Sequence, residues 1–229
     1  MTKKTLAVIA SVSCLALATS ANAAVFMFNA SGTGGDGPES ASATINTSPT
    51  QITIDLSSLI ANPTGAGQLV SGIELMLGST PGSATFGGGT GTLINIAPGG
   101  AVTPDGTTTT HWGDALVGSN LFVATAGTGS AGGSPINLII GPGPYTNANP
   151  SITGRNPSIQ NTGHFTINLT GLTGALTVTG VQFEFGTGPD NTLPGVAVPE
   201  PAIWALMLFG VGAIGATMRA SRRTTLATA

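Results

Sequence analysis

The sequence predicts an all-β body, an antiparallel β-sandwich over residues 24–187, and three observations support this. Apolar residues recur at every second position over short stretches, the pattern of half-buried strands. Clusters of Gly, Pro, Asn, Ser and Thr separate these stretches, and 35 of the 229 residues are glycine. The 3.6-residue periodicity of an amphipathic helix is almost absent from the body. About 175 residues are enough for one domain with a single hydrophobic core.

The chain begins with the three regions of a secretory signal peptide, residues 1–23. Lys3 and Lys4 form a basic start, and an apolar segment follows over residues 6–18. We expect a signal-peptide helix that directs export through the Sec translocon and is removed by signal peptidase. The expected cleavage site is formed by Ala21, Ala23 and Ala24.

The only cysteine, Cys14, lies inside the apolar segment of the signal peptide. A lipoprotein signal would need small and apolar residues before this cysteine, and Ser11-Val12-Ser13 fits that pattern poorly. The mature chain therefore has no thiol for a disulfide, a nucleophile or a metal site.

The body is expected to contain short strands in which apolar side chains point inward and polar side chains point outward. The strands are expected at residues 25–28, 51–56, 73–77, 93–96, 121–124, 135–140, 165–169 and 181–185. The inward positions predicted to be buried are Ile52, Ile54, Ile73, Leu75, Ile167, Phe183 and Phe185.

Two segments of the body resemble two later ones. Residues 52–59 are similar to 165–172, and residues 71–78 are similar to 179–186. This is either an internal repeat or the reuse of one alternating pattern by half-buried strands. In both cases we expect the two strand pairs to face each other as the layers of the sandwich. Residues 188–198, rich in Gly and Pro, are expected to be a linker.

The C-terminal region contains a run of 17 residues without a charge, 202–218. As a helix this run would extend roughly 26 Å, which is just enough to cross a bilayer. A basic end at residues 219–223 would remain in the cytoplasm, so the body would lie outside the membrane. A short tail, residues 224–229, follows.

The motifs around this run occur in a recognisable order. They are Pro199, Glu200, Pro201, Trp204, Ala205, Arg219, Arg222 and Arg223. This order resembles the PEP-CTERM sorting signal, in its PEPxxWA form, of Gram-negative bacteria. The resemblance covers residues 199–223 and implies processing near the Pro-Glu-Pro motif by exosortase, a membrane-embedded cysteine protease. Such tails usually end closer to the arginines than this one does. Each residue alone would also suit an ordinary single-pass anchor.

The charge of the body limits its partners. Residues 24–198 contain eight acidic residues and one base, Arg155, giving a net charge of −7. Nucleic acids and anionic membrane surfaces attract clustered Lys and Arg, so no nucleic-acid partner is expected.

Catalytic and metal-binding motifs are not evident in the body. It has two histidines, His111 and His164, and no G-x-S-x-G sequence that would place a nucleophilic serine. Calcium could bind at Asp36 and Glu39 or at Asp105 and Asp114, but no calcium-loop pattern is present. We expect no cofactor and no enzymatic activity, and His164 is expected at a strand edge.

The best candidate for ligand binding is the pair His111 and Trp112, which contains the only tryptophan of the body. An exposed pair could stack on a sugar ring, whereas a partly buried pair would be structural. We therefore expect a non-catalytic protein of the cell surface or extracellular matrix. The family resemblance implies that it comes from a bacterium that makes exopolysaccharide and biofilm, and that exopolysaccharide is a candidate partner. The alternative is a carbohydrate-binding or adhesive module, and a secreted hydrolase is a third hypothesis.

Overall fold

The computed structural model describes residues 23–172, 174, 176–188, 191–199, 208 and 211. The regular structure in this part of the chain is mostly β-strand, besides the short helix α1 and the 3-10 turn η1, so the all-β prediction is confirmed. The elements are β1 (Ala24–Gly34), β2 (Gly37–Thr47), β3 (Gln51–Ser58), η1 (Ala66–Gln68), β4 (Val70–Leu77), β5 (Ser83–Ile96), β6 (Val102–Thr108), β7 (Gly113–Val117), β8 (Asn120–Ala124), β9 (Ile139–Ile140), α1 (Pro150–Thr153), β10 (Ser158–Thr170), β11 (Val178–Phe185), β12 (Thr192–Pro194) and β13 (Val196–Ala197).

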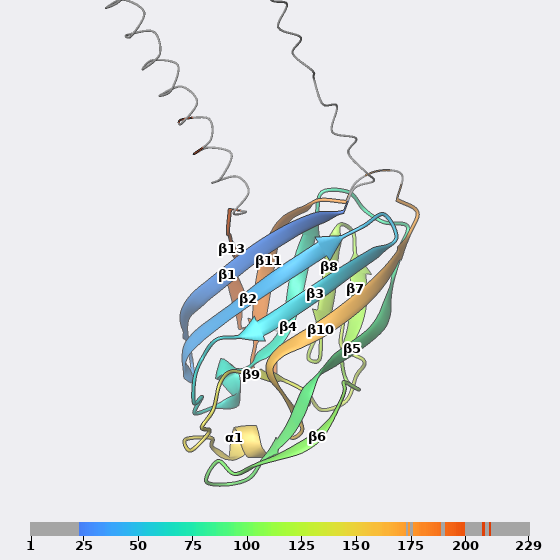
Figure 1. The fold of residues 1–229 in the computed structure, drawn as a ribbon. Coiled ribbons are helices and arrows are strands. Elements are labelled where there is room, and N and C mark those ends of the chain that lie inside the picture. Colours follow the sequence, from blue (N-terminus) through green and yellow to red (C-terminus); the bar gives the residue numbers. More distant parts are fainter. Residues whose placement is uncertain are drawn as a thin grey trace, which may run out of the picture.

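The strands form two layers packed against each other (Figure 1). One layer has the order β1-β2-β3-β10-β5-β6, with every pair antiparallel. The other has the order β12-β11-β4-β8-β7 and is also antiparallel. The short strand β9 pairs with β10 in the first layer and β4 in the second, so it links them on one side.

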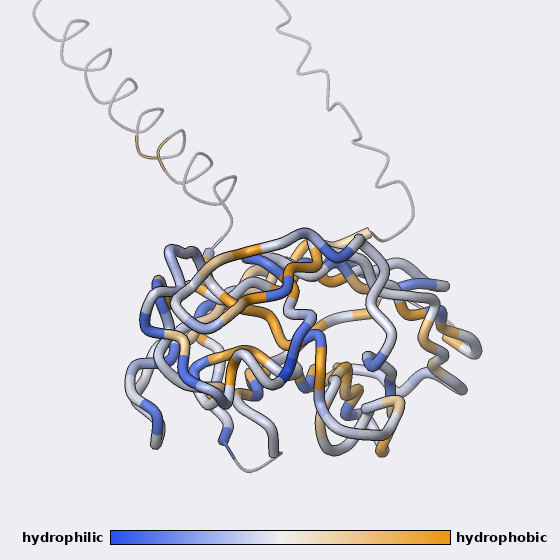
Figure 2. Tube along the Cα trace, turned by 90° about the horizontal axis from the view of Figure 1, so that it is seen from below, coloured by the Kyte–Doolittle hydropathy of each residue, from blue (hydrophilic) through white to orange (hydrophobic). Residues whose placement is uncertain are grey.

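The core between the layers is made by the alternating apolar positions of the strands. All seven positions predicted to be buried are buried. Figure 2 views the body from below and shows apolar residues interleaved with hydrophilic ones along the strands. A second, smaller cluster around Leu138, Tyr145 and Ile152 packs beneath the long loop that carries α1.

The similar segments are arranged differently from the expectation. Each strand pairs directly with its counterpart, because Ile54 of β3 lies opposite Phe165 of β10 and Ile73 of β4 lies opposite Phe183 of β11. The predicted arrangement, in which each sequential pair forms its own layer, is therefore wrong. Counterparts with the same alternation place their apolar residues on one face when paired, which explains why they are neighbours within a layer.

The expected linker also proves to be part of the sheet. In β12, Leu193 lies opposite Phe183 of β11, and in β13, Ala197 lies opposite Phe28 of β1. The residue between the two strands is Gly195, whose amide donates to the carbonyl of Val181 at 2.9 Å. A side chain there would collide with Cγ2 of Val181, so glycine is needed for this close approach. Residues 192–197 thus connect the edges of both layers.

Both apolar ends of the chain fall largely outside the described residues. This applies to residues 1–22, and to the run 202–218 except for Leu208 and Val211. Within the described part, no helix has both the length and the apolar character needed to cross a membrane.

Candidate functional site

The expected sorting motif begins immediately where the sheet ends. Pro199 is exposed and follows Val198, whose amide donates to the carbonyl of Met27 at 2.8 Å. The remaining predicted motif residues lie outside the described part; they are Glu200, Pro201, Trp204, Ala205, Arg219, Arg222 and Arg223. The motif is therefore joined to the folded body without an intervening linker.

The expected signal-cleavage site lies close to the same point. Ala23 is exposed and Ala24 is the first residue of β1, whereas Ala21 lies outside the described residues. Met27, which holds Val198, is three residues along β1 from Ala24, a separation of about 10 Å in an extended strand. Figure 1 shows that the start of β1 and the end of the described chain after β13 both lie at the upper end of the body. The two expected processing sites thus share one end of the molecule.

The predicted glycan contact is corrected by the burial of Trp112. This side chain is only 2% exposed, and its ring stacks on Phe165 with the centroids 4.1 Å apart. Its indole N–H donates to the carbonyl of Asn137 at 2.8 Å, so its polar atom is satisfied inside the protein. His111 is half-buried, with its Nδ1 2.9 Å from Oγ1 of Thr110. Trp112 is a core residue, because its large apolar ring gains more from packing than from solvent exposure.

A different polar hollow lies on the outer face of the first layer. His164 lies inside β10, between β3 and β5, and not at the expected strand edge. Its Nδ1 is 2.7 Å from Oδ1 of Asp55, and both side chains are about half exposed. The hollow has a volume of about 420 Å³, and three consecutive glycines of β5 form one side of it. It is lined by Thr53, Asp55, Gly87, Gly88, Gly89, Thr90, Thr108, Thr109, His164, Phe165 and Thr166.

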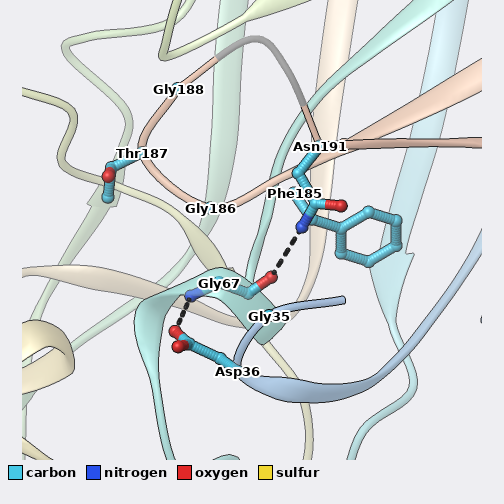
Figure 3. A pocket seen from close by; sticks show the side chains of 8 residues that line it. All are labelled: Gly35, Asp36, Gly67, Phe185, Gly186, Thr187, Gly188 and Asn191. Carbon is cyan, nitrogen blue, oxygen red and sulfur yellow. Dashed lines mark hydrogen bonds between the residues drawn. The ribbon is translucent and has the colours of Figure 1, made fainter. Parts of the chain in front are cut away.

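Asp36 and Glu39, the first acidic pair considered for calcium, accept hydrogen bonds from other segments of the protein. Asp36 accepts a hydrogen bond from the amide of Gly67 at 2.8 Å, and Glu39 accepts one from the side-chain amide of Asn191. Figure 3 shows Asp36, Gly67 and Asn191 around a hollow of about 420 Å³. These contacts tie the β1–β2 turn to η1 and to the start of β12.

Asp105 and Asp114, the second acidic pair considered for calcium, each accept a hydrogen bond from a different part of the protein. Asp105 accepts from the side-chain amide of Asn95 at 2.9 Å, and Asp114 accepts from the amide of Phe86 at 2.7 Å. Across the described residues, no three His, Cys, Asp or Glu side chains gather in a way that could hold a metal ion.

Sequence reasoning missed a buried carboxyl on β11. Glu184 occupies an outward position by alternation, yet it is 5% exposed. Its strand neighbour is Gly72, and the carboxyl lies over this residue, where a side chain would collide with it. Burial, together with the nearby charge of Glu74, raises the pKa of Glu184 from 4.5 to about 7. No signal in the sequence identifies this carboxyl, because the glycine opposite it is known only from the register of β4 and β11.

Comparison with known proteins identifies the C-terminal end. The family model of the PEP-CTERM protein-sorting motif matches residues 197–223. The match begins at Ala197, which belongs to β13, and it includes every predicted motif residue. No curated protein and no solved structure matches the chain significantly. The motif marks an exported protein that is made as a membrane-anchored precursor and processed by exosortase, and the body is not identified by these comparisons.

Proposed function

We propose that this chain is a non-catalytic protein of the bacterial cell surface or extracellular matrix, and that exosortase releases it from the inner membrane. In this proposal a signal-peptide helix, residues 1–23, is first removed before Ala24. A single transmembrane helix, residues 202–218, then holds the precursor until exosortase cuts near residues 199–201. The observation that carries the proposal is the sorting-motif match over residues 197–223.

The position of the motif supports such processing. Pro199 is exposed at the end of β13, and proline cannot extend a strand or a helix by donating a backbone hydrogen bond. A second proline at position 201 has the same effect. We propose that the two prolines keep residues 199–201 out of regular structure, so that a membrane-embedded protease could reach them.

The proposed role in the matrix rests on the outer face of the first layer. Uncharged hydroxyl and amide side chains lie opposite one another across neighbouring strands, such as Asn46, Thr53 and Thr166. A surface of this kind hydrogen-bonds water and neutral polymers without strong attraction to charged partners. It suits a structural component among exopolysaccharides and biofilm polymers.

The hollow at Asp55 and His164 favours a second candidate function, the binding of a neutral sugar. A carboxylate, an imidazole and several threonine hydroxyls converge there on a space larger than one sugar ring. Sugars are recognised by such polar groups, but this hollow has no exposed aromatic side chain of the kind proposed from the sequence. We therefore propose Asp55 and His164, in place of Trp112, as the candidate sugar contacts.

The sorting proposal is tested by replacing Pro199, Glu200 and Pro201 together with alanine. The triple variant should remain uncut in the membrane fraction of a host that contains exosortase, whereas the parent protein is released. Pro194→Ala, which changes an exposed proline just upstream of the motif, is the matched control and should be released normally. Release of the triple variant at the parental rate would contradict the sorting proposal, and residues 202–218 would then be interpreted as an ordinary membrane anchor. Mass spectrometry of the released protein should show Ala24 as its first residue.

The sugar-binding candidate is tested with a glycan array. The purified body and the variants Asp55→Ala and His164→Ala would be compared with Asp105→Ala, which removes a similarly exposed carboxylate from β6. Binding that is lost in the first two variants and kept in the third would support the hollow as the site. Binding that survives in all three would exclude it.

A further inference from the structure

An uncharged apolar patch surrounds the point where the chain leaves the body. Val25 and Met27 of β1 are 42% and 37% exposed, and Val196 of β13 is 71% exposed. Val198, which follows β13, is half-buried. We call these four residues the exit patch.

The sheet register places all four side chains on one face. Val196 lies opposite Asn29, and the amide of Val198 donates to the carbonyl of Met27, which continues the same register. Residues directly opposite each other in an antiparallel pair share a face, as do alternate residues along one strand. Val25, Met27, Val196 and Val198 therefore form a continuous apolar surface at the sheet edge.

The residues directly beside the exit patch are uncharged, whereas charged residues occur one step further away, at Asp55, opposite Thr44 across β2, and at Glu200, two positions after Val198. The neighbours on β2 are Thr44, opposite Met27, and Asn46, opposite Val25. No charged residue occurs in residues 23–31, 41–51 or 191–199. An apolar surface bordered by uncharged polar groups suits the boundary between lipid headgroups and acyl chains better than it suits bulk water.

The length of the connection forces this end of the body close to the membrane. Only three residues, 199–201, separate Val198 from Ala202, where the uncharged run begins, so the four steps between these two residues span at most about 14 Å. The headgroup region on each side of a bilayer is itself roughly 5 to 8 Å thick. A body attached to a membrane helix at residue 202 is therefore held within about 10 Å of the lipid surface at its point of exit.

We propose that in the anchored precursor the exit patch lies in the interfacial zone of the lipid bilayer, so that the body is held in one orientation on the membrane. This inference rests on the proposed membrane anchor. Ala24 is the neighbour of Val25, so the signal peptide also attaches at the exit patch before its removal. Both attachments to the membrane thus favour the same orientation.

The test uses the full precursor, made in a host without exosortase and with its signal peptide removed. Without residues 1–23, which contain Cys14, the protein has no cysteine, so single cysteines can be introduced at Val25, Met27 and Val196 and labelled with an environment-sensitive dye. The controls are Val102→Cys and Thr107→Cys, at exposed positions of β6, which Figure 1 shows at the far end of the body. Each protein is placed in phosphatidylcholine vesicles at about one chain per vesicle, with and without lipids that carry a quencher near the headgroup.

The dyes at the three patch positions should lose most of their fluorescence to the quencher lipids and emit at shorter wavelength, whereas both control dyes should be unaffected. Equal quenching at all five positions, or none at the patch, would overturn the inference. Quenching of the patch dyes only at high chain density would also overturn it, because a second copy would then be the occupant. Alkaline carbonate extraction distinguishes the failure of the proposed membrane anchor from the failure of the proposed orientation. If carbonate extracts the chain from the vesicles, both proposals are wrong. If the chain stays in the membrane but the patch dyes are not quenched, only the orientation is wrong.

Discussion

Replacing Glu184 with glutamine should stabilise the body at neutral and alkaline pH and have little effect in acid. The buried carboxyl has a pKa of about 7 in the folded protein, against 4.5 for an ordinary glutamate. Below pH 4.5 it is protonated in both the folded and the unfolded chain, so it carries no charge to bury. Between pH 4.5 and 7 only the unfolded chain ionises, and the free energy of unfolding falls as the pH rises. Above about pH 7 the full penalty is present.

The size of the effect follows from the difference between the two pKa values. Each unit corresponds to about 1.4 kcal/mol, so the penalty at pH 8 is about 3 kcal/mol. Glutamine has nearly the same shape and stays neutral, and it can donate a hydrogen bond where Oε2 of Glu184 has no partner. Glu184→Gln should therefore unfold at higher urea than the parent at pH 8, and at a similar concentration at pH 4.

The measurement is urea unfolding of residues 24–199 between pH 4 and pH 8, followed by the fluorescence of Trp112. This ring is buried and is the only tryptophan in that segment, so it reports the loss of the core directly. Glu74→Gln is the matched control, because removing the neighbouring charge should move the pH dependence of the parent toward lower pH. A stability difference between Glu184→Gln and the parent that does not change with pH would refute the electrostatic explanation.

Three further predictions concern packing and the surface. Trp112→Ala removes the ring stacked on Phe165 and should cost about 3 to 5 kcal/mol in urea unfolding followed by circular dichroism; a change below 1 kcal/mol would mean that the ring is not in the core. Gly195→Val should collide with Val181 and detach the last strands, which limited proteolysis would detect as faster cleavage after β11, and unchanged cleavage would contradict the contact. Asp55→Ala should alter stability by no more than about 1 kcal/mol, because its contact with His164 is half exposed and screened by water; a larger loss would indicate a structural role.

The sequence was sufficient for the fold class and most of the core, because alternation alone determines which side of a strand is buried. It did not determine which strands pair. Ile54 could have opposed many apolar residues, and its actual partner, Phe165, is more than a hundred residues away. Residues 192–197 read as a linker because three or fewer residues per strand are too short to show alternation.

For the candidate site, too, the sequence predicted some features and not others. The sorting motif was recognised from the order of its residues, and the family match confirms it. The sequence left open whether Trp112 is an exposed sugar contact or a buried residue, because it lies between strands, where alternation gives no information on burial; the structure shows that it is buried. The contact between Asp55 and His164 depends on the register of β3 and β10, which appears only in three dimensions.

The closure of the sheet by β13 has a consequence for the order in which the protein can fold. The first strand of the mature chain pairs with the last, since Phe28 lies opposite Ala197. A chain that emerges from a narrow channel with its N-terminus first leaves this edge of β1 unpaired until Ala197 has passed through. Open strand edges readily pair with other chains, so a molecule halted partway remains prone to aggregation. If the chain is exported through such a channel, as proposed above, the final hydrogen bonds of the sheet form only when residues 202–218 enter the channel.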